Sequence, residues 1–302
     1  MNTTDLICFF LGPVHWQKTP EDITASVTSC VLSSIFALTA VLGNGTIMFI
    51  IWKTRELHSP SFALLFCLAV SDFLVGMVGQ PSFVAFKIAE LKENFSAYCN
   101  LRIVRFFCGW ITAGVSFLTL SGVCIDRLLA LTLHLRYKSI VTVRRALIFV
   151  TAVWMLWTMW TISKFWIGDK WHIVSATLAL LPIVITALCT FQIFKIARKH
   201  QRQLNQQNLR MGNEQNGTVD VLKCKKSAVT VLYIYGLLLV FYLPFLAVMV
   251  VETRTGYTQS LKIAYDYVAT VVLINSSVNP FIYCWRLKQI RLSVKKLIGF
   301  GH

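Results

Sequence analysis

The chain has 302 residues, of which 56% are hydrophobic, and its mean hydropathy is +0.64. These values are too apolar for one or two soluble domains and indicate a membrane protein. The formal net charge is +16, but the basic residues lie between apolar runs rather than in one patch. We therefore expect them to meet membrane lipids, and we expect no nucleic-acid partner.

Seven uncharged or nearly uncharged runs are long enough to cross a bilayer as α-helices, which takes about 20 residues. They are Ile23–Trp52, Leu57–Phe86, Phe106–Ile125, Ala146–Ser163, Trp171–Phe194, Ser227–Val251 and Tyr267–Trp285. The sequence thus predicts an all-α fold, a seven-transmembrane helix bundle. Arg286–Ile298 places its apolar residues on one helical face and predicts an amphipathic surface helix after the seventh span. We divide the chain into an extracellular tail (1–24), the bundle (25–285) and a cytosolic amphipathic helix with a short tail (286–302).

The distribution of Lys and Arg predicts that the N-terminus lies outside, at the plasma membrane. In that orientation nine of the 29 basic residues fall in outer segments and 20 in inner ones, as the positive-inside rule requires. No cleavable signal peptide is expected, because the apolar patch Leu6–Leu11 is short and lacks a basic lead. Lys199–Lys226, between the fifth and sixth spans, is polar and charged, and we predict a mobile cytosolic loop there.

Two kinds of covalent modification are predicted on the outer side. Asn2 and Asn94 begin N-x-Ser/Thr sequences and are candidate glycosylation sites. Cys8 and Cys99 lie in outer segments, where oxidation is possible, whereas six other cysteines sit in apolar runs. A Cys8–Cys99 disulfide is therefore a hypothesis, and two free thiols are the alternative.

Characteristic polar, tryptophan and proline residues occur once per span and in a fixed order. They are Asn44, then Leu68, Ala69 and Asp72, then Asp126-Arg127, Trp154, Pro182, Pro244 and Asn279-Pro280-Phe281-Ile282-Tyr283. In this order they resemble the rhodopsin-like (class A) G-protein-coupled receptors over about residues 25–298. The inner loops, with Leu57-His58-Ser59-Pro60, resemble the cluster of melanocortin, lysophospholipid, cannabinoid and adenosine receptors. The resemblance implies a receptor, not an enzyme, that binds an extracellular ligand and activates a heterotrimeric G protein.

Asp72 is an ionisable residue in the middle of a span, and such residues are functional candidates because their burial is costly. The resemblance implies that polar side chains surround it and that an allosteric sodium ion binds there. The predicted sodium ligands are Asp72, Ser116, Asn275 and Asn279, with Asn44 and Ser276 nearby. The alternative is a protonated Asp72 in a purely structural hydrogen-bond network. No other cofactor is expected.

The resemblance also implies a switch at the inner end of the bundle. Its predicted members are Asp126, Arg127, Asn279, Pro280 and Tyr283. We expect Arg127 to pair with Asp126 while the inner cleft is closed and to contact the G protein when the sixth helix moves. Leu128 and Cys224 depart from the family pattern in ways that predict a weaker inactive state and basal activity. Thr190, which replaces a Tyr that steadies the active state, predicts the opposite.

A ligand site is predicted in the outer half of the bundle. Its candidate residues are Phe83, Arg105, Phe106, Gly109, Trp110, Tyr242 and Phe245. Arg105 matches the basic residue that lipid receptors of the cluster use, which favours an amphipathic or lipid-like ligand with an anionic end there. Gly109 stands where amine receptors carry an acid, so an amine is not expected. The alternatives are an Arg105 that reaches toward headgroups, aromatics that face lipid or neighbouring helices, and a peptide or odorant ligand.

Other functions are weighed against this one. Tyr242 beside Phe241 resembles olfactory receptors and favours a chemosensory role, and the altered switch residues are compatible with a constitutively active or non-signalling protein. A transporter or membrane enzyme is disfavoured, because Asp72 is the one charge expected within the membrane and all six His lie at edges or in loops.

Overall fold

The structure is a computed structural model that describes residues 7–11, 19–133, 136–168, 170–211, 217–256, 258–297 and 299. Within these residues every regular element is helical. The elements are η1 (Phe9–Leu11), α1 (Pro20–Lys53), η2 (Arg55–Leu57), α2 (Pro60–Leu74), η3 (Val75–Gly79), α3 (Gln80–Leu91), α4 (Phe95–Leu133), α5 (Tyr137–Ile140), α6 (Val143–Ile162), α7 (Lys164–Ile167), α8 (Lys170–Met211), α9 (Gly217–Thr255), α10 (Gln259–Arg286) and α11 (Lys288–Leu297).

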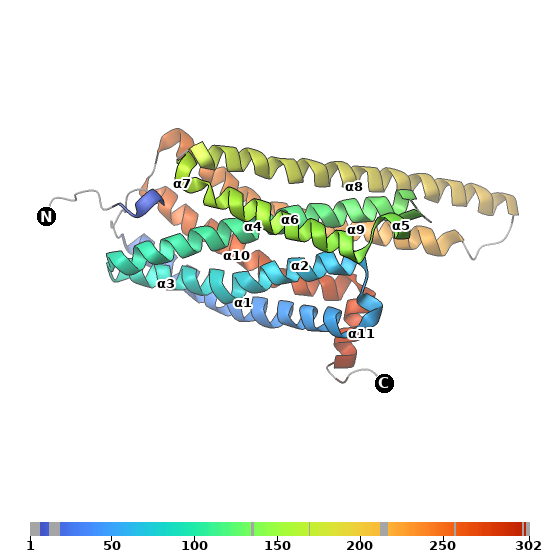
Figure 1. The fold of residues 1–302 in the computed structure, drawn as a ribbon, viewed down its shortest axis with the longest axis horizontal. Coiled ribbons are helices and arrows are strands. Elements are labelled where there is room, and N and C mark those ends of the chain that lie inside the picture. The colour runs from blue at the N-terminus through green and yellow to red at the C-terminus, as the bar shows by residue number, and fades with distance from the viewer. Residues whose placement is uncertain are drawn as a thin grey trace.

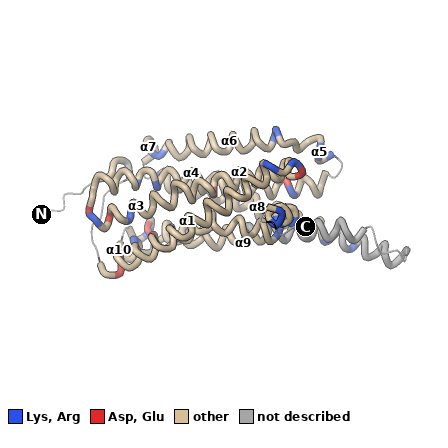
Figure 2. Tube along the Cα trace, turned by 90° about the horizontal axis from the view of Figure 1, so that it is seen from below, with Lys and Arg blue, Asp and Glu red and all other residues tan. Residues whose placement is uncertain are grey.

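Seven helical spans are long and apolar enough to cross a membrane, which confirms the predicted bundle. The second span combines α2, η3 and α3. The spans run side by side, and α11 leaves their common direction (Figure 1). We call the end at which α1 begins the outer end and the opposite end the inner end. Charged residues gather mainly at these two ends (Figure 2), so the middle of the bundle is suited to lipid.

The first span starts earlier than its apolar run does. Thr19 caps α1: its Oγ1 accepts a hydrogen bond from the backbone N–H of Asp22, and the Asp22 carboxylate accepts one from the N–H of Thr19. Pro20 follows at the first helical position, where a missing N–H costs nothing. The helix therefore begins inside the stretch that the sequence assigned to the extracellular tail.

Prolines shape the later spans. Pro81 lacks a backbone donor near the start of α3, and the helix immediately before it is wound more widely, at Val75–Gly79. Pro182, Pro244 and Pro280 lie inside α8, α9 and α10. Such interruptions are tolerated in membrane helices because neighbouring groups satisfy the freed backbone.

The main apolar core lies in the inner half. It draws on α1, η2, α2, α4, α9, α10 and α11. Its buried members are Ile47, Ile50, Ile51, Leu57, Phe62, Leu65, Leu68, Ala69, Phe117, Leu120, Leu238, Tyr283 and Ile290. Ile290 is fully buried, so α11 docks part of its apolar face on the bundle as well as offering it to the membrane surface.

The connection between the fifth and sixth spans differs from the prediction. α8 continues as far as Met211 and α9 starts at Gly217, so most of Lys199–Lys226 is helical rather than a mobile loop. Extending an existing helix needs no new nucleus, and Gln, Lys, Arg and Leu have high helix propensity. A polar composition therefore did not prevent helix formation there.

Candidate functional site

An aromatic cluster joins four helices in the outer half. The ring of Trp110 in α4 lies 4.9 Å from that of Trp171, which is fully buried in the first turn of α8, and 6.3 Å from Phe245 in α9. Phe245 lies 5.9 Å from Tyr265 of α10, and Phe106 lies 5.4 Å from Trp171. The structure thus brings together Phe106, Trp110 and Phe245, and it adds Trp171 and Tyr265, which sequence reasoning missed.

Arg105 lies beside this cluster and faces α3. Its Cζ is 5.7 Å from the ring centroid of Phe83 and 4.7 Å from that of Phe86. Both rings are buried, so the guanidinium rests on the interior of the bundle. Within the described part of the chain Arg105 forms no ion pair. Stacking on an aromatic face is favourable but does not itself supply a negative charge.

The two remaining predicted pocket residues lie at different depths. A Cβ built on Gly109 would meet no atom within 4 Å, so there is open space one turn below Arg105. Tyr242 lies deeper, with its ring 4.4 Å from that of Phe117, and it packs against the inner core. A side chain at position 109 would therefore meet no steric barrier, whereas Tyr242 lies between the outer aromatic cluster and the inner core.

Four charged side chains that the sequence placed in outer loops are buried between α3 and α10. Lys87 Nζ lies 2.6 Å from Glu90 Oε2 and 2.6 Å from Asp266 Oδ2, and Lys262 Nζ lies 2.9 Å from Glu90 Oε1. Each side chain is at most 9% exposed. Both helices extend beyond their apolar runs, so these four charges lie on helical turns at the outer end of the bundle and not in loops.

The N-terminal segment is fixed to the outer end of the bundle. Cys8 and Cys99 are joined by a disulfide with a Cα–Cα distance of 5.3 Å. Arg102 Nη2 donates a hydrogen bond of 2.7 Å to the carbonyl oxygen of Leu11. Cys8 is fully buried in a cluster that includes Phe86, the ring on which Arg105 rests. The segment therefore covers part of the predicted ligand site.

The structure describes one of the two predicted glycosylation sites. Asn2 lies outside the described residues. Asn94 is exposed, just before α4, and its Oδ1 accepts a hydrogen bond from the N–H of Ala97. Glycosylation at both sites stays a prediction.

A polar layer lies midway along the bundle. Asp72 is 1% exposed, and its Oδ2 accepts a hydrogen bond of 2.7 Å from Nδ2 of Asn279. The hydroxyl of Ser116 lies 3.0 Å from that of Ser71, and Asn275 is buried in the same region of α10. Asp72 and Asn279 are thus directly joined, while Ser116 is engaged by a neighbour of Asp72.

Asn44 links this layer to α10 and leaves one oxygen unpaired. Its Nδ2 donates hydrogen bonds of 2.9 Å to the carbonyl oxygens of Ala40 and Ser276. Its buried Oδ1 has no partner among the described residues, and the same is true of the hydroxyl of Tyr283. Buried oxygens of this kind are normally satisfied by internal water or by a cation.

At the inner end Asp126 is held by two hydroxyl groups instead of by Arg127. Its Oδ2 accepts from Ser61 Oγ of α2 at 2.5 Å, and its Oδ1 accepts from the Tyr137 hydroxyl of α5 at 2.6 Å. Burial, reinforced by the hydrogen bond to Asp126, raises the pKa of Tyr137 to about 12, so this hydroxyl keeps its proton at neutral pH.

The expected ion pair between Asp126 and Arg127 does not form within the described residues, and its formation in a closed state stays a prediction. Both carboxylate oxygens of Asp126 already accept hydrogen bonds, from Ser61 and from Tyr137, so neither is available to Arg127. Arg127 is half-buried at the inner rim of the bundle, in the position from which it is expected to meet a partner.

The inner ends of α9 and α10 are joined by a contact that sequence reasoning missed. The ring of Tyr233 lies 5.3 Å from that of Trp285, and Arg286 Cζ lies 5.0 Å from both ring centroids. Tyr283, two residues before Trp285, is 1% exposed in the core. The side chain of Cys224 lies outside the described part, so its predicted effect on this region stays a prediction.

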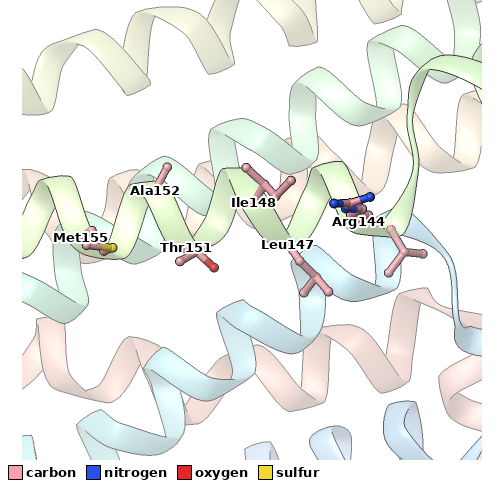
Figure 3. A pocket seen from close by; sticks show the side chains of 7 residues that line it. Arg144, Leu147, Ile148, Thr151, Ala152 and Met155 are labelled. Carbon is pink, nitrogen blue, oxygen red and sulfur yellow. The ribbon is translucent and has the colours of Figure 1, made fainter.

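A shallow apolar groove lies on the surface of α6 (Figure 3). Its lining residues are Val143, Arg144, Leu147, Ile148, Thr151, Ala152 and Met155. Ile148 and Met155 are 60% and 61% exposed. Exposed apolar side chains on a spanning helix belong to its lipid-facing surface, and the groove shares no residue with the predicted ligand site.

Comparison with known proteins agrees with this architecture. The family model described as the 7 transmembrane receptor (rhodopsin family) matches residues 43–176 and 169–283. Melanocortin receptor 4 of Danio rerio is 23% identical over 270 residues, which covers 86% of this chain and 80% of that receptor. The histamine H2 receptor of Cavia porcellus is 25% identical over 295 residues, which covers 90% and 79%.

The fold has a close counterpart among solved structures. The crystal structure of squid rhodopsin superimposes with a TM-score of 0.79 at 18% identity, over 95% of this chain and 90% of that chain. The family match spans most of the chain, including the residues of the polar layer and of the inner switch. The chain therefore belongs to the rhodopsin family of seven-transmembrane receptors, multi-pass membrane proteins that bind ligands and signal through G proteins and are not enzymes.

Proposed function

We propose that this receptor binds an amphipathic or lipid-like small molecule, with the anionic end of the ligand at Arg105. The observation that carries the proposal is the guanidinium stacked on Phe83 and Phe86 with no ion pair in the described residues. Carboxylates and phosphates bind guanidinium groups through paired, charge-assisted hydrogen bonds. The rings of Trp110 and Phe245, with the open space at Gly109, offer apolar surface for the rest of the ligand.

We also propose that the N-terminus lies outside, at the plasma membrane, and that the inner end meets the G protein. The excess of Lys and Arg in the inner segments supports this orientation. The Cys8–Cys99 disulfide supports it independently, because disulfides persist in oxidising compartments. In this orientation the outer end of the bundle, which the N-terminal segment covers in part, faces the extracellular ligand.

The relatives named for melanocortin and for histamine raise other ligand classes. An amine is disfavoured, because Gly109 offers no acid and the carboxylates of Glu90 and Asp266 already contact lysines. An anionic ligand is favoured instead, since Arg105 is a cation that forms no ion pair within the described residues.

Arg105→Gln tests the proposed function. A library of anionic amphiphiles is screened by guanine-nucleotide exchange on receptor reconstituted with each class of Gα subunit. For an agonist found in this way, the substitution should lower potency about 10- to 100-fold, because it removes a charged hydrogen-bond donor. The agonist should keep part of its potency on Arg105→Lys. An uncharged analogue of the agonist should be equally potent on the wild type, on Arg105→Gln and on Arg105→Lys. Equal potency of the anionic agonist on the wild type and on Arg105→Gln would discard the site.

The inner site predicts basal signalling. Arg127 is not held by Asp126 here, so we expect measurable nucleotide exchange without ligand. Replacing both hydroxyl donors, by Ser61→Ala and Tyr137→Phe, frees the carboxylate to attract Arg127. Basal exchange should then fall about two- to tenfold, the range expected for lost hydrogen bonds. In the control variant Tyr137→Phe alone, basal nucleotide exchange should fall less. Unchanged or increased basal exchange in the double variant contradicts this mechanism.

We further propose that the polar layer binds a sodium ion. Asp72 supplies the negative charge, Ser116, Asn275 and Asn279 supply oxygen ligands, and the unpaired Oδ1 of Asn44 supports the assignment. Sodium neutralises the buried carboxylate when bound. Replacing choline chloride with sodium chloride at equal ionic strength should raise the unfolding temperature of the purified receptor by about 2–5 °C. Asp72→Asn should abolish the increase, and an equal response of that variant would exclude the ion.

A further inference from the structure

The short helix α5 exposes a serine at the inner end of the bundle. Ser139 is exposed, and its hydroxyl donates a hydrogen bond of 2.8 Å to the carbonyl oxygen of Arg136. α5 has four residues, Tyr137–Ile140, and none of them is buried. A single exposed turn opens at small cost, because it has few contacts to lose. An enzyme that binds its substrate in an extended form can therefore reach Ser139.

Basic side chains surround Ser139 in the sequence and in space. Arg136 precedes it by three positions and Lys138 by one, and both are exposed. Arg145, in the first turn of α6, donates a hydrogen bond from Nη1 to the carbonyl oxygen of Ile140, the residue after Ser139. No acidic residue occurs between positions 136 and 145. This charge pattern fits a protein kinase with an acidic substrate groove, since complementary charges decide which segments such an enzyme accepts.

We propose that Ser139 is a phosphorylation site for a serine/threonine kinase with an acidic substrate groove, and that phosphorylation loosens the turn that holds Tyr137 on Asp126. The inference rests on the proposed orientation, in which the inner end faces the cytosol and its ATP. Ser139 Oγ forms a bond to the γ-phosphorus of ATP, and the bond from that phosphorus to the β,γ-bridging oxygen breaks. ADP leaves, and the hydroxyl proton passes to a base of the kinase.

The phosphate group changes two contacts of α5. Ser139 Oγ loses its proton, so it can no longer donate to the carbonyl oxygen of Arg136. The group that replaces the proton carries close to two negative charges at neutral pH. It attracts the guanidinium of Arg145, because charge-assisted hydrogen bonds to a phosphate are stronger than a bond to the carbonyl oxygen of Ile140. Both of these side-chain bonds to carbonyl groups of the turn are then lost, and α5 is destabilised.

The same turn carries a residue of the inner switch. Tyr137 lies two positions before Ser139, and its hydroxyl donates a hydrogen bond of 2.6 Å to Asp126 Oδ1. When α5 opens, Tyr137 leaves the carboxylate, and Ser61 still donates to Oδ2. The freed oxygen of Asp126 can then attract Arg127, and basal nucleotide exchange falls. Phosphorylation of Ser139 thus restrains signalling without ligand.

The site is tested on the full chain in nanodiscs, incubated with ATP and the catalytic subunit of cAMP-dependent protein kinase. Mass spectrometry of peptides should place phosphate on Ser139. The variant Arg136→Gln/Lys138→Gln should be modified about tenfold more slowly, because it lacks the two cations that the acidic groove binds. Ser293, which follows Arg291 by two positions in α11, is the comparison within the same chain. Phosphate on Ser293 or Thr142 but not on Ser139 would show that the site is wrong.

The effect on the switch is measured before and after phosphorylation, and again after treatment with a phosphatase. Hydrogen–deuterium exchange of the backbone amides of residues 137–141 should become about tenfold faster and then return. Basal nucleotide exchange should fall about two- to fivefold, the range expected for one lost hydrogen bond. Ser139→Ala should not respond to the kinase in either measurement. In Tyr137→Phe, phosphorylation should cause no further fall in nucleotide exchange.

The outcomes separate this inference from the proposed function. A wild type without basal exchange on any Gα subunit contradicts the proposed basal signalling, while the peptide map and the amide exchange still decide on Ser139. Unchanged amide exchange in fully phosphorylated receptor overturns the inference and leaves the ligand site at Arg105 untouched. An equal fall in nucleotide exchange in the wild type and in Tyr137→Phe overturns the connection through Tyr137, since the phosphate then acts by another route.

Discussion

Lys87→Met is expected to destabilise the receptor by about 3–5 kcal/mol, the cost of removing one partner from a buried ion pair. Methionine keeps the length and the apolar stem of lysine, so little packing is lost. The loss comes from the carboxylates of Glu90 and Asp266, whose side chains are 5% and 6% exposed and lose their shared cation. The unfolding temperature of the purified protein should fall by about 10 °C.

The double variant Lys87→Met/Asp266→Asn is the matched control. It removes both charges of the pair that joins α3 to α10 and leaves the Glu90–Lys262 pair in place. Most of the lost stability should return, because a buried pair replaced as a whole costs far less than a pair broken in half. Additive losses in the two single variants and the double variant would show that Lys87 and Asp266 do not interact.

These buried charges mark the limit of what the sequence predicts. Uncharged runs of about 20 residues are necessarily helical in lipid, since every backbone group has to be satisfied within the segment, and all seven spans were found in this way. For a charged residue just beyond such a run, the sequence does not decide between a loop and a further helical turn. Lys87 and Asp266 are far apart in the sequence, so only the tertiary structure could reveal the contact between their side chains.

The Asp126-Arg127 motif led to a predicted contact that the structure does not contain, for a similar reason. Asp126 and Arg127 are adjacent in the sequence, and their pairing was predicted from that adjacency within a family pattern. In the structure both carboxylate oxygens of Asp126 are occupied by hydroxyl donors from α2 and from α5. The aromatic cluster shows the opposite case: Phe106 and Trp110 are one turn apart on α4, so their common position followed from helical periodicity alone. The contribution of Trp171 from α8 required the tertiary packing.

Gly114→Ala is expected to destabilise the receptor by about 2–4 kcal/mol, from overpacking and a lost hydrogen bond. A Cβ at Gly114 would lie 1.7 Å from Nε1 of Trp157, whose indole fills the space between α4 and α6. The indole is not free to give way cheaply, because its N–H donates a hydrogen bond of 2.8 Å to the carbonyl oxygen of Trp110. To make room for one methyl group, the Trp157 side chain has to change its position, which breaks this hydrogen bond.

Gly109→Ala, on the same helix, separates this steric effect from any general effect of alanine. No atom lies within 4 Å of a Cβ at Gly109, so the added methyl group costs no contact. Alanine favours the helix over glycine by up to about 1 kcal/mol, so the ligand-free unfolding temperature should stay constant or rise. If both variants unfold at the same temperature, the indole of Trp157 does not occupy the space over Gly114. If only Gly114→Ala falls, the close approach of α4 and α6 rests on that glycine, and the position of Trp110 in the ligand site rests on it too.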